Sequence, residues 1–323
     1  MQDAPLFNDI ANGPPGGRAV WRSTSDGVRI RVAHWPRKAD TPENGIGNGT
    51  VLLFPGRTEY VEKYGLNASE LTARGFDVLC IDWRGQGLSD RPDEERVLGH
   101  VGHFDEYQLD LAEMIALAQE LSLPRPFTLL GHSMGGCIGL RALHNGLDVS
   151  GACFSGPMWG IVMSPAIRPV AWGSSWAMHQ TPLKMTLAPG TKRQTYVLAE
   201  PFKDNMLTTQ IDMWKAMQMQ AVAHPELTLG GPTMGWLYAA LTEMRELAQM
   251  PAPSVPAVTL LGSNERIVEM DPIHALMDRW PNGRLEVLDG LEHEVLMEAP
   301  EIRERVYASI EALSQPAQAG SVA

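Results

Sequence analysis

A serine, a histidine and a carboxylate of this sequence have the types and the order along the chain that nucleophilic catalysis requires. Ser133 is the middle residue of Gly131-His132-Ser133-Met134-Gly135, a Gly-x-Ser-x-Gly pattern that places a serine on a sharp turn between a strand and a helix. A serine hydroxyl is a weak nucleophile at neutral pH, so it needs a base within hydrogen-bond reach and a group that orients the base. Ser133 is therefore the predicted nucleophile, and its two partners must come from elsewhere in the chain.

The residues on each side of the serine have predicted roles of their own. A serine on so tight a turn needs neighbours without a Cβ, because a side chain would collide with the backbone, and this explains Gly131 and Gly135. Met134 begins the helix that follows, so its backbone N–H has no acceptor within that helix. The sequence therefore predicts the N–H of Met134 as a donor to a developing oxyanion.

His293 is the predicted base. In hydrolases with this motif the order along the chain is serine, acid, histidine, with the last two on loops after late strands. Of the nine histidines, only His293 lies late in the chain, directly after an apolar strand predicted over 284–288 and before the terminal helix predicted over 300–313. His132 is adjacent to the serine, but its side chain is expected to point back into the loop.

The orienting acid is expected after the strand predicted over 257–262. Two glutamates follow that strand, Glu265 and Glu269, and Asp271 comes shortly after them. Glu265 is favoured because it lies three residues past the glycine that ends the strand, at the carboxyl edge of the sheet. Glu269 remains the alternative, and a surface ion pair with Arg266 would be a purely structural explanation of Glu265.

A second oxyanion donor is expected in the loop after the strand predicted over 50–54. That strand ends in Pro55-Gly56-Arg57. A glycine-containing loop after a strand, well before the nucleophile, is where the second donor lies in an alpha/beta-hydrolase. The backbone N–H of Arg57 is therefore the predicted second donor.

The elements that must position these residues alternate between strands and helices. Strands are predicted over 19–23, 28–34, 50–54, 76–81, 127–130, 149–155, 257–262 and 284–288, and helices over 61–74, 104–121, 134–145, 272–279 and 300–313. This rhythm is typical of an α/β fold with a mostly parallel sheet that is flanked by helices on both faces. The predicted core therefore consists of residues 18–155 and 253–313, with a flexible N-terminus over 1–17, a polar loop over 38–48 and a flexible tail over 314–323.

Residues 156–252 interrupt the rhythm and are predicted to form a mainly helical cap, or lid, over the site. The segment has no buried-strand pattern and is too long for a plain connection. Its first part is rich in tryptophan and methionine, and four residues are predicted to bind substrate as an apolar wall: Met158, Trp159, Trp172 and Trp176. Packing of the cap on the core is the competing explanation, and a weak peripheral contact of the cap with a membrane is a third.

Composition excludes several classes of protein. The chain has 323 residues, of which 44% are hydrophobic and 20% charged, as in ordinary globular proteins. A formal net charge of −12 argues against nucleic acid as a partner and against electrostatic docking on an anionic bilayer. The sequence shows no signal peptide, no membrane span and no zinc-type Cys/His spacing, so we expect a cytoplasmic protein without a metal or other cofactor. Three cysteines, Cys80, Cys137 and Cys153, are expected to be buried free thiols.

The sequence resembles the monoacylglycerol lipase and bacterial lysophospholipase group of alpha/beta-hydrolases. The resemblance extends from Val51 to Leu313 and is carried by the segments GHSMGG, FPGRTEY, FDVLCIDWRGQGLSDRP, GHVGHFDEYQLDL, SGPMWGI, GGPTMGW, LLGSNERIV and DGLEHEVLME. It implies an alpha/beta-hydrolase fold with a cap insertion. Two positions differ from the common pattern: Pro55-Gly56 stands where the family often has His-Gly, and Glu265 stands where many members have Asp. Both are compatible with catalysis, because the oxyanion donor is backbone and Glu is an accepted triad acid.

The resulting prediction is a serine carboxylic-ester hydrolase that acts on a monoacyl lipid, either a lysophospholipid or a monoacylglycerol, through Ser133, His293 and Glu265 and an acyl-enzyme. The alternatives are another reaction on the same triad, such as short-chain esterase, lactonase, prolyl aminopeptidase or acyltransferase activity. A non-catalytic binding protein is a further alternative, although such proteins usually lack a triad member and none is missing here.

Overall fold

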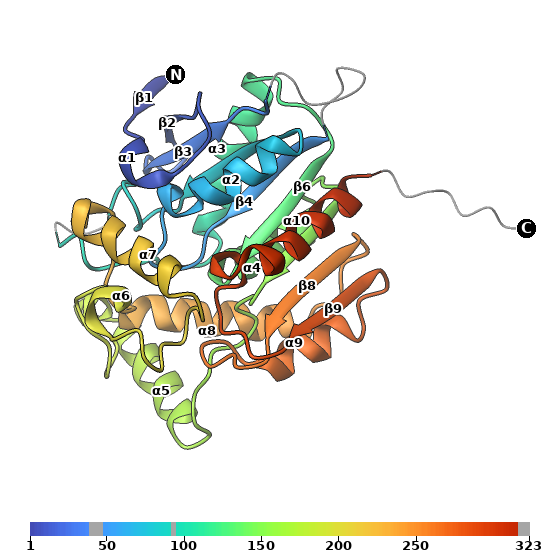
Figure 1. Ribbon diagram of the computed structural model, residues 1–323. Coiled ribbons are helices and arrows are strands. Elements are labelled where there is room, and N and C mark those ends of the chain that lie inside the picture. Colours follow the sequence, from blue (N-terminus) through green and yellow to red (C-terminus); the bar gives the residue numbers. More distant parts are fainter. Residues whose placement is uncertain (39–47, 92–94, 316–323) are drawn as a thin grey trace, which may run out of the picture.

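One large sheet organises the chain (Figure 1). The computed structural model describes residues 1–38, 48–91 and 95–315. The strands are β1 (Gln2–Ala4), β2 (Arg18–Ser23), β3 (Arg29–Trp35), β4 (Gly49–Phe54), β5 (Phe76–Asp82), β6 (Phe127–His132), β7 (Gly151–Ser155), β8 (Ala257–Gly262) and β9 (Gly283–Leu288).

The sheet has nine strands in the order β1-β2-β3-β5-β4-β6-β7-β8-β9. The three N-terminal strands join their neighbours antiparallel, and the six strands from β5 to β9 in that order pair in parallel. The carboxyl ends of these six strands therefore meet at one edge, which is where the chemistry-bearing loops were expected. The mostly parallel sheet that the sequence predicts is confirmed.

Helices cover both faces of the sheet. The longer core helices are α2 (Gly65–Ala73), α3 (Glu106–Glu120), α4 (Met134–His144), α9 (Met270–Met277) and α10 (Pro300–Ser314). Short elements in the core are α1 (Asn8–Ala11) and the 3-10 turns η1 (Val61–Tyr64) and η4 (Val295–Met297). Figure 1 shows α2 and α10 crossing one face in front of the strands, with α4 and α9 behind them.

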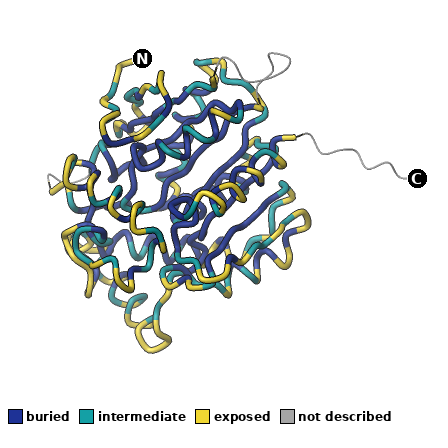
Figure 2. The backbone as a smooth tube through the Cα atoms, in the orientation of Figure 1, coloured by how far each residue is buried: buried dark blue, intermediate teal, exposed yellow. Residues whose placement is uncertain are grey.

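Two hydrophobic clusters form because alternate residues of the central strands point to opposite faces. Leu52 of β4 and Leu129 of β6 belong to the cluster with α3 and α4, whereas Val51 and Leu130 belong to the cluster with α2 and α10. The central strands are buried along their whole length in Figure 2, which is why they read as continuous apolar runs in the sequence.

The connection between β7 and β8 is helical. Residues 156–252, called the cap segment from here on, contain α5 (Ile167–His179), α6 (Tyr196–Ala199), α7 (Ile211–Ala223) and α8 (Met234–Gln249), and the turns η2 (Pro182–Met185) and η3 (Pro225–Leu227). No strand lies in this segment, all of which is described, as the sequence predicts. Figure 1 shows α5 projecting at the lower end of the molecule.

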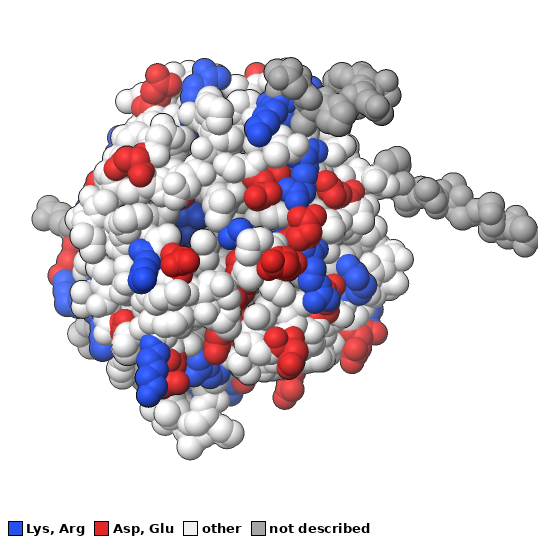
Figure 3. Space-filling model, viewed as in Figure 1, with Lys and Arg blue, Asp and Glu red and all other residues white. Residues whose placement is uncertain are grey.

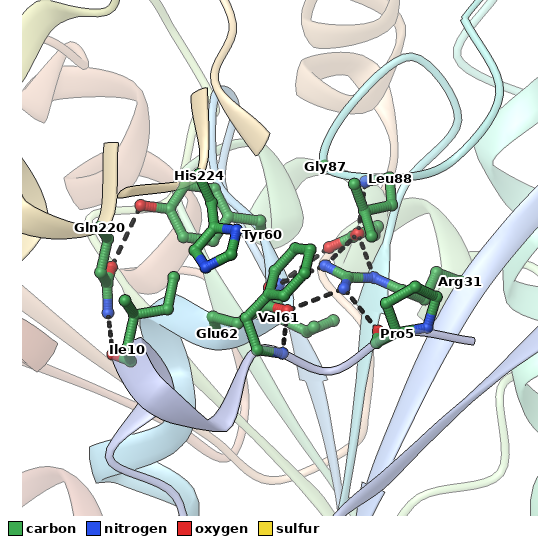
Figure 4. Close-up of polar contacts among 12 residues, drawn as sticks. Pro5, Ile10, Arg31, Tyr60, Val61, Glu62, Gly87, Leu88, Gln220 and His224 are labelled. Atoms are coloured by element: carbon green, nitrogen blue, oxygen red, sulfur yellow. Dashed lines mark hydrogen bonds and ion pairs between the residues drawn. The ribbon is translucent and has the colours of Figure 1, made fainter. Parts of the chain in front are cut away.

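The N-terminus differs from its prediction as a flexible segment over 1–17. β1 pairs with β2, and the guanidinium of the buried Arg31 donates to the carbonyl of Pro5 at 2.9 Å and to Glu62 at 2.8 Å (Figure 4). Gln220 of α7 donates to the carbonyl of Ile10 at 2.9 Å. These bonds are made by residues far away in the sequence, so local composition gives no sign of them.

The structure also bears on the predictions for two polar segments, for the cysteines and for membrane spans. Most of the polar loop predicted over 38–48 and most of the tail predicted over 314–323 lie outside the described residues, and Ser314 is the last residue of α10. Cys80, Cys137 and Cys153 are buried free thiols, as predicted. Every helix within the described part of the chain is too short or too polar to span a bilayer.

Candidate active site

Ser133 lies on the strained turn that the sequence predicts between β6 and α4. Its backbone has φ 50° and ψ −117°, a conformation that residues with a side chain rarely adopt. Hydrogen bonds to neighbouring loops hold it there: its N–H donates to Ser155 at 3.0 Å, and its carbonyl accepts from the N–H of Met158 at 2.9 Å. A Cβ on Gly135 would lie 2.0 Å from the carbonyl oxygen of Phe54, so the close approach of α4 to β4 requires that glycine.

A hydrogen bond joins His293 and Glu265, whose positions on loops after late strands the sequence predicts. The Nδ1 atom of His293 lies 2.7 Å from Oε2 of Glu265, and both side chains are almost completely buried. The other oxygen of Glu265 accepts the N–H groups of Ile267 and Val268 at 2.7 and 3.1 Å. With Nδ1 bound to the carboxylate, the Nε2 atom of the imidazole is the one left to act on a hydroxyl.

The environment of Glu265 keeps it ionised. Burial alone would raise the pKa of Glu265, but the hydrogen bond and charge of His293 and the two backbone N–H groups outweigh burial, so the pKa is lowered. The alternative acid, Glu269, instead pairs with Arg168 of α5, and Arg266 pairs with Glu292 at 3.0 Å. The ion pair between Glu265 and Arg266 that would have explained Glu265 structurally is not formed.

Ser133 and His293 line one cavity of about 430 Å³. Most of the other side chains around it are apolar and come from the cap segment and from the loop after β8: Ile161, Val197, Leu207, Met217, Trp236 and Val268. Among the described residues no direct hydrogen bond joins the Ser133 hydroxyl to the imidazole. Catalytic hydrogen bonds are often long before substrate binds, so the shared cavity is the relevant geometry here.

The two predicted oxyanion donors are the backbone N–H of Arg57, which lines this cavity, and that of Met134, which follows the cavity-lining Ser133. Within the described residues, no group accepts the N–H of Arg57 or of Met134, whereas Glu59 accepts the N–H of Gly56 and Gln86 accepts that of Thr58 at 3.2 Å. The loop that carries Arg57 is therefore held by its neighbours while its own N–H stays available.

Only one of the four predicted substrate-binding residues lines the cavity. Met158 does so. Trp159 does not line the cavity. Its indole N–H lies 3.3 Å from the carbonyl of Gly136, and its side chain belongs to the hydrophobic core. Trp172 packs against cap residues and Trp176 is 56% exposed. The prediction of an acyl wall is therefore corrected for Trp159, Trp172 and Trp176. Trp159 lies in the loop after β7 and packs into the core, whereas Trp172 and Trp176 lie on a packed and a solvent-facing side of α5 that sequence spacing alone did not assign.

A buried charged cluster next to the site was missed by sequence reasoning. Glu59 accepts from Lys63, from the hydroxyl of Tyr64 and from the N–H of Gly56, and Lys63 also lies 2.6 Å from Glu294. His132 lies 3.3 Å from Glu294, and its ring centroid is 4.8 Å from that of His293. The four charged or titratable residues Glu59, Lys63, His132 and Glu294, called the buried cluster below, thus connect the loop after β4 to the loop that carries His293. The i, i+4 spacing of Glu59 and Lys63 in an otherwise buried stretch was the available signal.

The charges of this cluster stabilise one another. Burial alone would raise the pKa of Glu294, but Lys63 and His132 outweigh it and hold that pKa well below its usual value. Burial alone would lower the pKa of His132, but Glu294 and Glu59 outweigh it and raise that pKa. Glu59, His132 and Glu294 offer ligand atoms within 4.8 Å of one another, as a metal site would require. The ammonium of Lys63 contacts both carboxylates and supplies the positive charge that a cation would bring.

Replacing Lys63 with methionine is expected to destabilise the fold by about 3–5 kcal/mol at pH 7, because it leaves two buried carboxylates without their cation. Urea unfolding followed by circular dichroism measures this. Lys192→Met is the matched control, since Lys192 forms an exposed pair with Glu200 and its loss should cost less than about 1 kcal/mol. Equal losses for the two variants would contradict the role of the buried cluster.

The same experiment has a pH signature. Because the pKa of Glu294 is lowered in the folded protein, its stabilising contribution is present above the unfolded value of about 4.3 and is lost as the pH falls. Without Lys63 the buried carboxylates gain protons more easily. The difference between wild type and Lys63→Met should therefore be smaller at pH 5 than at pH 7.

Comparison with known proteins places this site in a family context. Residues 47–300 match the family described as "Serine aminopeptidase, S33". The chain is 32% identical over 292 residues to the protein named "Lysophospholipase L2" from Escherichia coli strain K12, covering 85% of this chain and 79% of that protein. It is 28% identical over 286 residues to "Probable lysophospholipase L2" from Haemophilus influenzae, covering 87% of each chain.

A solved structure with a similar fold is a soluble variant of monoglyceride lipase from Saccharomyces cerevisiae in complex with a substrate analog. The two structures superpose with a TM-score of 0.69, covering 92% of this chain and 94% of the other, at 17% sequence identity. The similarity therefore extends over the sheet and the cap segment together, although at this identity it bears on the fold alone.

Proposed function

The chain belongs to the Serine aminopeptidase, S33 family and has the alpha/beta-hydrolase fold, and from this premise we propose that it hydrolyses the ester of a monoacyl lipid through Ser133, His293 and Glu265. It is a carboxylic-ester hydrolase of the lysophospholipase and monoacylglycerol lipase group. The observation that carries the finer proposal is that Ser133 and a carboxylate-bound His293 line one largely apolar cavity.

In the proposed first half-reaction His293 takes the proton of Ser133 while the serine oxygen attacks the ester carbonyl. The backbone N–H groups of Arg57 and Met134 donate to the oxyanion that forms. His293 then gives its proton to the leaving alcohol, and the acyl group stays on the serine. Glu265 orients the imidazole and stabilises its charged form, which its own ionised state permits.

In the second half-reaction a water molecule takes the place of the alcohol. His293 removes a proton from that water, the resulting oxygen attacks the acyl carbonyl, and the same two N–H groups hold the second oxyanion. The proton returns to the oxygen of Ser133, and a fatty acid leaves. Each group is thus returned to its starting state.

The apolar walls of the cavity favour an acyl chain as the bound group over a small polar substrate. Its walls include Met158, Met206 and Met217, whose flexible thioether side chains adapt to chains of different shape. Trp236 and Leu207 add further apolar surface. In this proposal the cap segment acts as the lid that excludes water from the site.

A substrate panel tests the proposal. Purified protein is assayed with a long-chain lysophospholipid, a monoacylglycerol of the same acyl chain, a short p-nitrophenyl ester and an aminoacyl amide. Higher kcat/KM for the two long-chain lipids than for the short ester is the expected result. A preference for the amide would instead favour the peptidase alternative that the name of the family suggests, and a preference for the short ester would favour a simple esterase.

Peripheral membrane contact through the cap is a separate part of the proposal. Several apolar side chains on and next to α5 are exposed, among them Ile167 at 58%, Val170 at 66% and Trp176 at 56%. Figure 3 shows that the projecting lower end of the molecule carries no charged side chain on the face in view. An apolar projection of this kind can enter the interface of a neutral bilayer.

The double variant Val170→Ala, Trp176→Ala is expected to cosediment with neutral liposomes roughly tenfold less than the wild type, because burial of these side chains supplies the binding energy. Cosedimentation over a range of lipid concentrations measures this. Val222→Ala on α7 is the matched control, since Val222 is 69% exposed but lies on another helix. Unchanged binding of the double variant would remove this part of the proposal.

A further inference from the structure

A second cavity adjoins the catalytic one and has a smaller share of apolar surface in its lining. It has a volume of about 490 Å³ and is called the side chamber below. Five residues line both spaces, so the two are neighbours across a shared wall: Arg57, Thr58, Thr191, Tyr196 and Met206. The side chamber adds the charged residues Lys192, Glu200, Asp204 and Arg266 to its lining. An ester held at Ser133 could therefore direct its acyl chain and its head group into different spaces.

Arg57 is the cation of the shared wall, and it lacks a counter-charge. Its guanidinium donates to the carbonyls of Gly230 and Gly231 at 2.9 Å and lies 4.9 Å from the ring centroid of Trp236. Among the described residues no carboxylate lies within ion-pair distance of it, and its buried Nε–H has no acceptor. Burial lowers the pKa of Arg57 to about 10, which still leaves it charged at neutral pH.

The other cations of the side chamber are compensated. Lys192 lies 2.6 Å from Glu200, and Arg266 lies 3.0 Å from Glu292. Asp204 is exposed to solvent whereas Arg57 is half-buried, so water screens the charge of Asp204 more than that of the guanidinium. The positive potential of the chamber therefore comes mainly from Arg57. A buried cation without a partner favours a ligand that brings a negative charge.

We propose that the side chamber is a head-group subsite for the phosphate of a lysophospholipid, with the guanidinium of Arg57 as its counter-charge. This inference rests on the proposed function and selects the phosphate-bearing substrate over the neutral monoacylglycerol. A guanidinium suits this task because its planar array of N–H donors matches phosphate oxygens. The backbone of the same residue would hold the oxyanion while its side chain holds the head group.

The test is the ratio of kcat/KM for a lysophosphatidylethanolamine to kcat/KM for a monoacylglycerol with the same acyl chain, both in the same mixed micelles. Arg57→Met is expected to lower this ratio about tenfold or more, because a charge-assisted hydrogen bond to phosphate is lost. Arg57→Lys should recover part of the ratio, since it keeps the charge. If either variant also disturbs the loop after β4 or the contacts with the cap segment, kcat/KM falls for both substrates alike. The ratio of the two kcat/KM values is then unchanged by that disturbance.

Arg245→Met is the matched control. Arg245 also lies over a cap tryptophan, 4.7 Å from the ring centroid of Trp172, but it does not line the side chamber. Its ratio should equal that of the wild type. A second readout is inhibition of p-nitrophenyl butyrate hydrolysis by glycerophosphoethanolamine, which the wild type should show at lower concentration than Arg57→Gln does.

The possible outcomes distinguish a failure of the subsite proposal from a failure of the proposed function. If Arg57→Met lowers the two kcat/KM values by the same factor, Arg57 is only a contact between core and cap, and the subsite proposal fails. A wild type that hydrolyses monoacylglycerol but not the lysophospholipid also overturns the subsite while leaving the proposed esterase intact. A wild type that hydrolyses neither lipid overturns the proposed function itself.

Discussion

Ser133→Ala is expected to reduce lipid ester hydrolysis by about 10⁴-fold or more, because the variant lacks the hydroxyl that carries the acyl group in the proposed mechanism. The strained backbone at Ser133 and its hydrogen bonds to neighbouring loops are made by main-chain atoms, so the alanine variant should keep the wild-type fold. The measurement is kcat/KM on a monoacyl lipid, with circular dichroism to verify folding.

A fluorophosphonate probe gives a second measurement on the same variant. The wild type should be labelled covalently and Ser133→Ala should not, because the probe reacts with an activated serine. Ser174→Ala is the matched control, since the hydroxyl of Ser174 donates to carbonyls of its own helix and Ser174 does not line the cavity. Retention of more than a few per cent of the activity by Ser133→Ala would show that the nucleophile lies elsewhere.

Glu265→Gln is expected to lower kcat by about 10³- to 10⁴-fold with a small change in KM. Glutamine keeps the shape of the side chain, but it lacks the negative charge that stabilises the imidazolium during proton transfer. Because the pKa of Glu265 is lowered in the folded protein, this charge is present at neutral pH and is lost only as the pH falls through that lowered value. The pH dependence of kcat/KM measures the effect.

Glu269→Gln separates the two candidate acids. Glu269 pairs with Arg168 and makes no contact with His293, so its kcat/KM should stay within about threefold of the wild type. Reversal of the two results, with Glu269→Gln inactive and Glu265→Gln active, would contradict the assignment of the acid. It would also require a rearrangement of the loop after β8 in the working enzyme.

Local sequence patterns were sufficient to predict the strands of the sheet and the loops at its carboxyl edge. The apolar runs of the central strands and the glycines around Ser133 reflect constraints between neighbours in sequence, such as burial on both faces and a turn too tight for a Cβ. Order along the chain then indicated His293 and Glu265, because loops after parallel strands meet at one edge. The cap segment was likewise recognised from its length and its lack of strand patterns.

Local sequence patterns did not predict contacts between residues that are distant along the chain. The tryptophans of the cap look alike in sequence, yet Trp159 belongs to the core and Trp176 faces solvent. The N-terminal residues look loose, yet Arg31 binds the carbonyl of Pro5. In both cases the deciding partner lies far away along the chain, so its position depends on how whole elements pack.

The sequence by itself therefore determined the fold class and predicted that Ser133, His293 and Glu265 lie on loops at one edge of the sheet, because strand order and turn geometry follow from local patterns. Only the tertiary structure decided which charges are paired. Glu294 is paired with Lys63, which lies 231 residues away along the chain. The guanidinium of Arg57 has no carboxylate partner among the described residues and instead donates to the carbonyl of Gly230, 173 residues away. Electrostatic energy depends on separation in space and on burial, and neither is encoded in local spacing.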